Sequence, residues 1–274
     1  MSEETLTAQF LDTAGGRIFV MMRRPSGAAR ACVLVVAPFA EEMNKSRRMI
    51  TLLAAQLAQC GVATVIVDPF GTGDSEGDFE AADWQRWKQD LWDAAQWCES
   101  QGARVTSLLG IRLGCALAAE FANESLAVSS TVFWQPVLDG SRFLDQFLRM
   151  RVAASMMEAD NRESTADLRR RFVAGESLEV AGYMMSARLA AQLDQVRLPA
   201  QLTARLGRLH WHEVVRASDV PPPAVSTRAV EQARAAGLDV SLHAIGGEPF
   251  WSSVEIVTNP VLVEHSAAAL AGQP

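Results

Sequence analysis

Hydrophobic and polar positions follow two alternating periods along most of the chain. Continuous apolar runs typical of buried parallel strands occur at Ala31–Ala37, Ala63–Asp68 and Val105–Leu109. Segments with helical periodicity separate these runs; one of them, Lys45–Cys60, ends at Gly61, which is suited to a C-terminal cap. Because strand and helix patterns alternate, we expect an α/β fold with a mostly parallel sheet and helices on both faces.

The same periods predict the remaining elements of this sheet. We expect strands at Arg17–Met22, Ser130–Gln135, Leu209–Val215 and Val240–Ala244, and helices at Ala81–Gln101, Leu113–Asn123 and Ser226–Ala236. Asn259 and Pro260 suit the N-cap and the first position of a last helix, which should end near Leu270.

The pattern changes between residues 141 and 198. This segment contains helical stretches rich in Met and Arg, without a convincing strand. We therefore expect a helical cap at 141–198, inserted into a core made of residues 1–140 and 199–274.

Charge and composition limit the classes of molecule that the chain is expected to bind. A net charge of −7 and a pI near 5.2 disfavour binding to nucleic acid or to an anionic membrane. The apolar runs are too short to span a bilayer, and the acidic N-terminus is not typical of a signal peptide. The four cysteines stand singly in apolar segments, which suits buried thiols in a reducing compartment. We expect a cytoplasmic protein whose partner is a small molecule.

One strand-to-helix junction has the spacing of a catalytic turn. The stretch "VTSLLGIRLGCALAAEF" places Gly110 and Gly114 as in the nucleophile elbow G-x-S-x-G, but its central residue is Arg112. A protonated guanidinium has no lone pair for nucleophilic attack. Ser107 and Cys115 do not occupy the apex, and we expect Cys115 to be a small buried side chain. The pattern predicts an elbow without serine chemistry.

Two other loops at the same sheet edge resemble parts of a hydrolase site. In "PFAEEMNKSRRM", the backbone N–H groups of Phe39 and Ala40 could form an oxyanion hole with that of Leu113. In "DPFGTGDSEG", Asp74 and Ser75 are typical of a tight turn, and we expect them to shape the loop and not to act in catalysis.

A catalytic base is not evident. The stretch after the last strand, "HAIGGEPFWSSVE", has no histidine where a base is expected, because His243 falls within the strand. His210 and His212 share one strand face, but no third ligand is evident, so we expect neither a metal nor another cofactor. The best positioned acids are Glu213 and Asp219.

Arg112 would require an anion nearby, because a helix N-terminus already carries positive character. Two sources remain open: a protein carboxylate, or the carboxylate or phosphate of a ligand. The candidate carboxylates are Glu41, Glu42 and Glu248. Phe39, Trp134 and Trp251 also fall at strand ends, where they could line an apolar pocket or pack between cap and sheet.

Four motifs together resemble a known family. "PFAEEMNKSRRM", "GTGDSEGDF", "GIRLGC" and "GEPFW" are similar to segments of the exosortase A system-associated hydrolases of the second type, over about Pro38 to Leu270. The resemblance implies an α/β-hydrolase fold, a cytoplasmic location and a role beside proteins of the exopolysaccharide and exosortase system. It does not identify a substrate.

Three functional hypotheses follow. The first is a protein that binds a small acyl or anionic ligand, with little ordinary serine hydrolysis. The second is an ester or thioester hydrolase, or an acyltransferase, with a rearranged site in which Glu41 or Glu42 activates water beside Arg112. The third is a non-catalytic interaction subunit whose cleft is filled by its own side chains.

Overall fold

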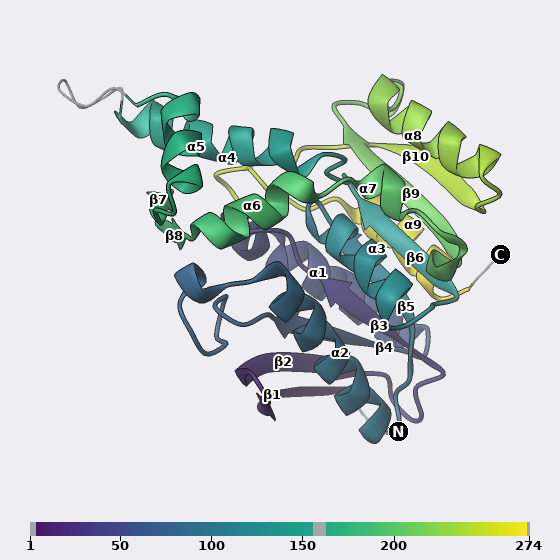
Figure 1. Ribbon diagram of the computed structural model, residues 1–274. Coiled ribbons are helices and arrows are strands. Elements are labelled where there is room, and N and C mark those ends of the chain that lie inside the picture. The colour runs from purple at the N-terminus through teal and green to yellow at the C-terminus, as the bar shows by residue number, and fades with distance from the viewer. Residues whose placement is uncertain (1–3, 156–162, 273–274) are drawn as a thin grey trace.

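The computed structural model describes residues 4–155 and 163–272, which form one central sheet of eight strands (Figure 1). The strand order is β1-β2-β4-β3-β5-β6-β9-β10; β1 and β2 are antiparallel to their neighbours and the other strands are parallel. The strands are β1 (Thr5–Thr13), β2 (Gly16–Arg24), β3 (Ala31–Val36), β4 (Val62–Asp68), β5 (Val105–Ile111), β6 (Ser130–Trp134), β9 (Arg208–Val215) and β10 (Val240–Gly246). This architecture confirms the predicted fold class.

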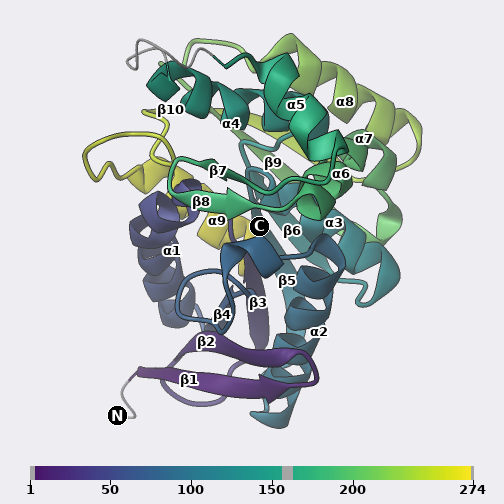
Figure 2. The ribbon, with the colours of Figure 1, turned by 60° about the vertical axis from the view of Figure 1, so that its left-hand side comes forward.

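Helices cover both faces of the sheet (Figures 1 and 2). One face packs against α1 (Glu41–Gln59) and α9 (Pro260–Leu270). The other packs against α2 (Trp84–Ser100), α3 (Gly114–Glu124) and α8 (Ala224–Ala235). Successive residues of β3 enter the two cores in turn, which is why this strand forms a continuous apolar run.

Between β6 and β9, the described helices α4 (Gly140–Ser155), α5 (Thr165–Val173) and α6 (Ala187–Gln195) lie over the carboxyl ends of the strands (Figure 1). The short helix α7 (Leu198–Gln201) follows. Against the expectation of helices alone, this segment also contains a hairpin of β7 (Leu178–Val180) and β8 (Tyr183–Met185). Strands of three residues are too short to give a periodic signal.

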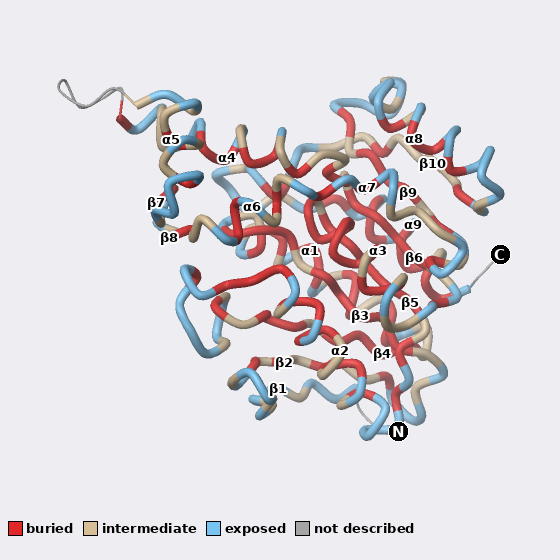
Figure 3. Tube along the Cα trace, in the orientation of Figure 1, coloured by how far each residue is buried: buried red, intermediate tan, exposed pale blue. Residues whose placement is uncertain are grey.

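The structure differs from the sequence-based expectations most clearly at β1 and at the start of α1. β1 was not predicted, because it is an edge strand with a mostly exposed surface and little apolar periodicity (Figure 3). α1 begins at Glu41, four residues before the expected start, so that its first turn reaches the sheet edge. At α9 the prediction is confirmed: the Asn259 side chain accepts a hydrogen bond of 3.0 Å from the Leu262 N–H.

No helix in residues 4–155 and 163–272 is long and apolar enough to cross a membrane.

Candidate functional site

The turn between β5 and α3 is tight and depends on its two glycines. Arg112, at the apex, has a φ of 56°, in the left-handed region that non-glycine residues rarely adopt. A Cβ on Gly114 would lie 2.4 Å from the Val36 carbonyl oxygen, and one on Gly110 would lie 2.7 Å from the Cys115 Cα. Both positions therefore exclude a side chain, and α3 starts directly against the end of β3.

The Arg112 side chain folds into a set of protein contacts. Its Nε lies 3.2 Å from Oε1 of Glu42, and one terminal nitrogen donates to the Gln135 carbonyl at 3.2 Å. Its guanidinium carbon lies 5.1 Å from the ring centroid of Trp251, a cation–π distance. The anion beside Arg112 is thus Glu42, the protein-carboxylate alternative of the two left open by the sequence.

Glu42 is held in a poorly solvated position. The second carboxylate oxygen, Oε2, is buried and has no hydrogen-bond partner among the described residues. Burial raises the pKa of Glu42, and the nearby Arg112 only partly opposes this rise. Side-chain exposures of 15% for Arg112 and 20% for Glu42 leave the pair partly open to solvent.

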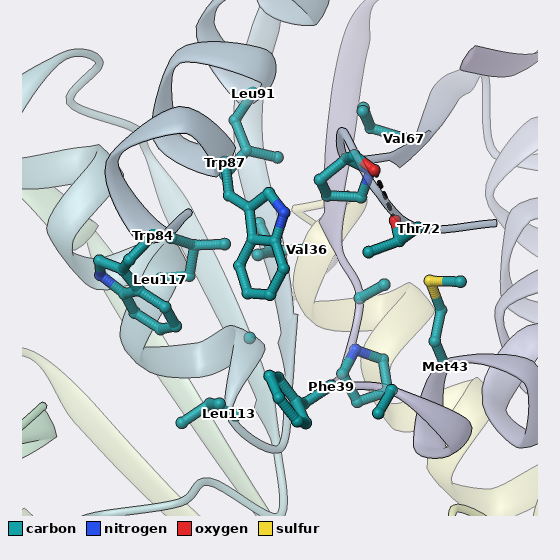
Figure 4. Close-up of a pocket in the computed structure, with 15 residues that line it drawn as sticks. Val36, Phe39, Met43, Val67, Thr72, Trp84, Trp87, Leu91, Leu113 and Leu117 are labelled. Carbon is teal, nitrogen blue, oxygen red and sulfur yellow. Dashed lines mark hydrogen bonds between the residues drawn. The ribbon is translucent and has the colours of Figure 1, made fainter. Parts of the chain in front are cut away.

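A small cavity lies on the α2 side of the turn (Figure 4). Its volume is about 30 Å³, enough for one or two water molecules and not for a substrate. Phe39 closes it: its ring packs edge-on against Phe79, Phe143 and Phe147 at centroid distances of 5.2 to 5.6 Å. The side chain of Phe39 therefore packs the core against α4.

The backbone at this cavity keeps unused donors. Phe39, Ala40 and Leu113 all border it, and their N–H groups have no protein acceptor in the described part of the chain. Ala40 adopts a φ of 51°, a second strained position at the sheet edge. The three N–H groups lie where the sequence placed an oxyanion hole.

A larger cavity lies on the other side of Arg112. Its volume is about 270 Å³. Four charged residues line it: Arg112, Asp139, Arg142 and Glu213. Pro136, Val137, Leu138, Phe143, Pro223 and Val225 supply apolar walls. The Arg142 side chain is exposed and has no ion-pair partner among the described residues, so this cavity has one guanidinium at its base and one free guanidinium on its wall.

Glu213 borders the same cavity from β9. It is 1% exposed and accepts a hydrogen bond of 2.7 Å from the Trp211 indole N–H. Burial raises the pKa of Glu213, which favours its neutral form and weakens its repulsion of an anion. Asp219, the other acid considered from the sequence, is exposed beyond the end of β9.

Three sequence-predicted site residues direct their side chains away from the Arg112 guanidinium. Glu41 is exposed, and its carboxylate accepts a hydrogen bond of 3.2 Å from the Tyr183 hydroxyl of β8. Trp134 accepts a hydrogen bond from the Arg112 N–H with its carbonyl, but its buried indole N–H donates to Ser266 at 2.8 Å, so its side chain packs in the core shared with α9. Glu248 is exposed and does not pair with Arg112.

The Gly-rich loop after β4 has the structural role expected for it. Ser75 accepts a hydrogen bond of 2.7 Å from the Phe19 N–H and donates to the Asp68 carbonyl. Asp74 donates its backbone N–H to the Asp68 carboxylate. Cys115 is fully buried, and burial raises the pKa of its thiol well above the usual range, so it is not an activated nucleophile.

The structure reveals groupings that the sequence did not predict. Gln135, with a φ of 46°, supplies the carbonyl that holds Arg112, and no local pattern identified it. His210, His212, His243 and His265 come together on β9, β10 and α9. Even so, no group of three or more His, Cys, Asp or Glu side chains within 4–155 and 163–272 is arranged to hold a metal ion.

Comparisons with known proteins bear on the fold of the chain. The model of the X-Pro dipeptidyl-peptidase (S15 family) matches residues 15–115. No curated protein matches the chain.

Solved structures match over almost the whole chain. A structure described as ferulic acid bound to Est1E from Butyrivibrio proteoclasticus has a TM-score of 0.70 at 14% identity, covering 97% of this chain and 99% of that one. A putative hydrolase from Agrobacterium vitis S4 has a TM-score of 0.59 at 18% identity, with 98% of each chain covered. An alpha-beta serine hydrolase homologue from Coxiella burnetii has a TM-score of 0.55 at 15% identity, covering 97% and 96%. The chain is an α/β-hydrolase-fold protein.

Proposed function

We propose that the protein binds a small anionic or acyl-bearing ligand beside Arg112 and carries out little ordinary serine hydrolysis. The observation that carries this proposal is the position of the guanidinium: Arg112 stands at the apex of the turn, where a serine nucleophile would stand in an elbow. The histidines gather on β9, β10 and α9, and Trp251 lies against Arg112 instead. In the described part of the chain, neither a serine nucleophile nor a histidine base therefore faces the apex, and the carboxylate beside it is that of Glu42.

The 270 Å³ cavity suits such a ligand. A carboxylate placed between Arg112 and Arg142 would accept charge-assisted hydrogen bonds from both. The apolar walls suit a short acyl chain or an aromatic ring. The ligand would compete with Glu42 for Arg112, and because burial raises the pKa of Glu42, that carboxyl can be released from the pair in its neutral form.

The wider role follows from the family resemblance. The motifs "PFAEEMNKSRRM" and "GEPFW" support this inference, because they contain Glu42 and Trp251, which contact Arg112, and Phe39, which borders the cavity beside Leu113. We infer a cytoplasmic protein acting with the exopolysaccharide and exosortase system, with residues 141–198 as its cap. Deleting the gene and measuring exopolysaccharide would test this assignment; unchanged polysaccharide and unchanged exosortase-dependent sorting would contradict it.

Binding is tested by titrating the purified protein with ferulate and with hexanoate in a calorimeter. Arg142→Gln should weaken binding about tenfold, or about 1.4 kcal/mol, because it removes one charged donor without touching the apex. Arg149→Gln is the matched control, since Arg149 is also exposed on α4 but does not line the cavity. Equal affinities for Arg142→Gln and Arg149→Gln, or no binding of either probe, would contradict the proposed site.

A second candidate is a hydrolase with a rearranged site. It is favoured by the buried, unpartnered Oε2 of Glu42, whose raised pKa suits a residue that exchanges a proton with water. In that case Glu42→Gln would abolish turnover of esters or thioesters, whereas on the binding proposal there is no turnover to abolish.

A further inference from the structure

All four histidines of the chain meet where α9 covers β9 and β10. His212 lies opposite His243 in the parallel register, and their ring centroids are 5.3 Å apart. His265 of α9 lies 6.2 Å from His212 and 6.0 Å from His243, and His210 stacks on His243 at 6.4 Å. The cluster therefore joins the sheet edge to the last helix.

His212 is the buried centre of this cluster, with 1% exposure. Its Nδ1 lies 3.3 Å from the Ser266 hydroxyl of α9. That hydroxyl already donates its single proton to the Leu262 carbonyl at 2.6 Å and accepts from the Trp134 indole at 2.8 Å. Nδ1 of His212 must therefore be the donor to Ser266, and this hydrogen bond ties β9 to α9.

The surroundings disfavour a proton on these rings. Arg208 of β9 and Arg234 of α8 add positive charge, and the nearby acid, Asp239, is paired with Arg208 at 2.9 Å. On β6, the residues opposite His210 and His212 are Val132 and Trp134, which carry no ionisable group. A second positive ring would lie about 6 Å from the first without a carboxylate between them to compensate.

We propose that the four-histidine cluster is an acid-sensitive clamp that holds α9 on β9 and β10 at neutral pH and releases the helix on protonation. The cluster is connected to the candidate site by the packing of α9 against α1. α9 shares a core with α1, which carries Glu42, and the Asn259 N–H before α9 contacts Met49 of α1 at 3.2 Å.

The direction of the effect follows from proton linkage. Burial lowers the pKa of three histidines: His210, His243 and, well below its usual value, His212. The charge of His243 makes a smaller contribution to the lowering at His210 and His212. The unfolded chain then binds more protons than the folded one below the ordinary histidine pKa of about 6.5. The contribution of the clamp to stability is complete above that value and is lost as the pH falls below it.

The test is urea unfolding of the natural protein at pH 7.5, 6.5 and 5.5, with EDTA present to exclude trace metal. Each histidine with a depressed pKa should raise the unfolding equilibrium constant by up to about tenfold per pH unit below about pH 6.5. His212→Asn keeps an N–H for Ser266 and should remove about tenfold per pH unit of this dependence. Hydrogen-exchange protection factors should fall more in α9 than in α2 at pH 5.5.

Two further variants test whether the dependence on pH comes from this cluster. His265→Asn, at an exposed position, should retain most of the dependence on pH. If His212→Asn does not fold, His243→Asn should still reduce the slope, because it removes the ring closest to His212. A natural protein whose stability is unchanged from pH 7.5 to 5.5, His212→Asn and His243→Asn variants that keep the natural slope, or equal loss of protection in α9 and α2 would each overturn the proposal.

Discussion

Gly114→Ala should destabilise the protein by about 3 kcal/mol, although it adds only a single methyl group. The new Cβ would lie 2.4 Å from the carbonyl oxygen of Val36 and 2.5 Å from that of Ala37. Both contacts are with backbone at the end of β3, which cannot move aside as a flexible side chain can. Thermal unfolding should show a decrease of about 6–12 °C in Tm.

Gly175→Ala is the matched control for this substitution. Gly175 has a φ of 91°, but no atom lies within 4 Å of the position that the added methyl group would take, so only backbone strain of about 1 kcal/mol is expected. If Gly114→Ala and Gly175→Ala destabilise equally, the close approach of α3 to β3 does not determine the turn at Arg112.

Arg112→Met should destabilise the protein by about 2–3 kcal/mol at pH 8, because it leaves the Glu42 carboxylate partly buried without its cation. Burial then raises the pKa of Glu42 without opposition. The folded state holds the proton more tightly than the unfolded one, so the variant is relatively stable below about pH 4.3 and loses stability as the pH rises through the raised pKa. The loss relative to the natural protein should therefore be smaller at pH 5 than at pH 8.

Urea unfolding at pH 5 and pH 8 checks this dependence. Adding Glu42→Gln to Arg112→Met removes the titrating group, so the double variant should lose the extra dependence on pH. A constant loss at both pH values, or a double variant as pH-dependent as Arg112→Met, would show that the ion pair does not control this site.

The fold could be predicted because its signals are local. The apolar runs of β3, β4 and β5 and the glycines at 61, 110 and 114 fix strands, a helix end and a turn within short windows. The hairpin of β7 and β8 was not predicted, because three-residue strands are too short to show an alternating pattern. β1 was not predicted, because an edge strand buries few of its side chains.

The site was predictable only where neighbouring strand ends bring residues together. Glu42 and Arg112 follow β3 and β5, which are neighbours in the sheet, so Glu42 could be proposed as one of several anions for Arg112. The direction of the Trp134 side chain could not be predicted, because the side on which a strand-end residue points changes with one position of register. The histidine cluster depends on the packing of α9 across two strands, a contact that no spacing in the sequence encodes.

The most direct test of the central claim is the hydrolysis of p-nitrophenyl butyrate by the purified natural protein, measured beside Glu42→Gln and a buffer blank. We expect a rate equal to the blank for both proteins, because the apex holds the Arg112 guanidinium in place of a serine, Glu42 is paired with it, and no histidine of the described residues contacts it. Turnover well above the blank that Glu42→Gln abolishes would contradict this account and assign Glu42 a catalytic role beside Arg112.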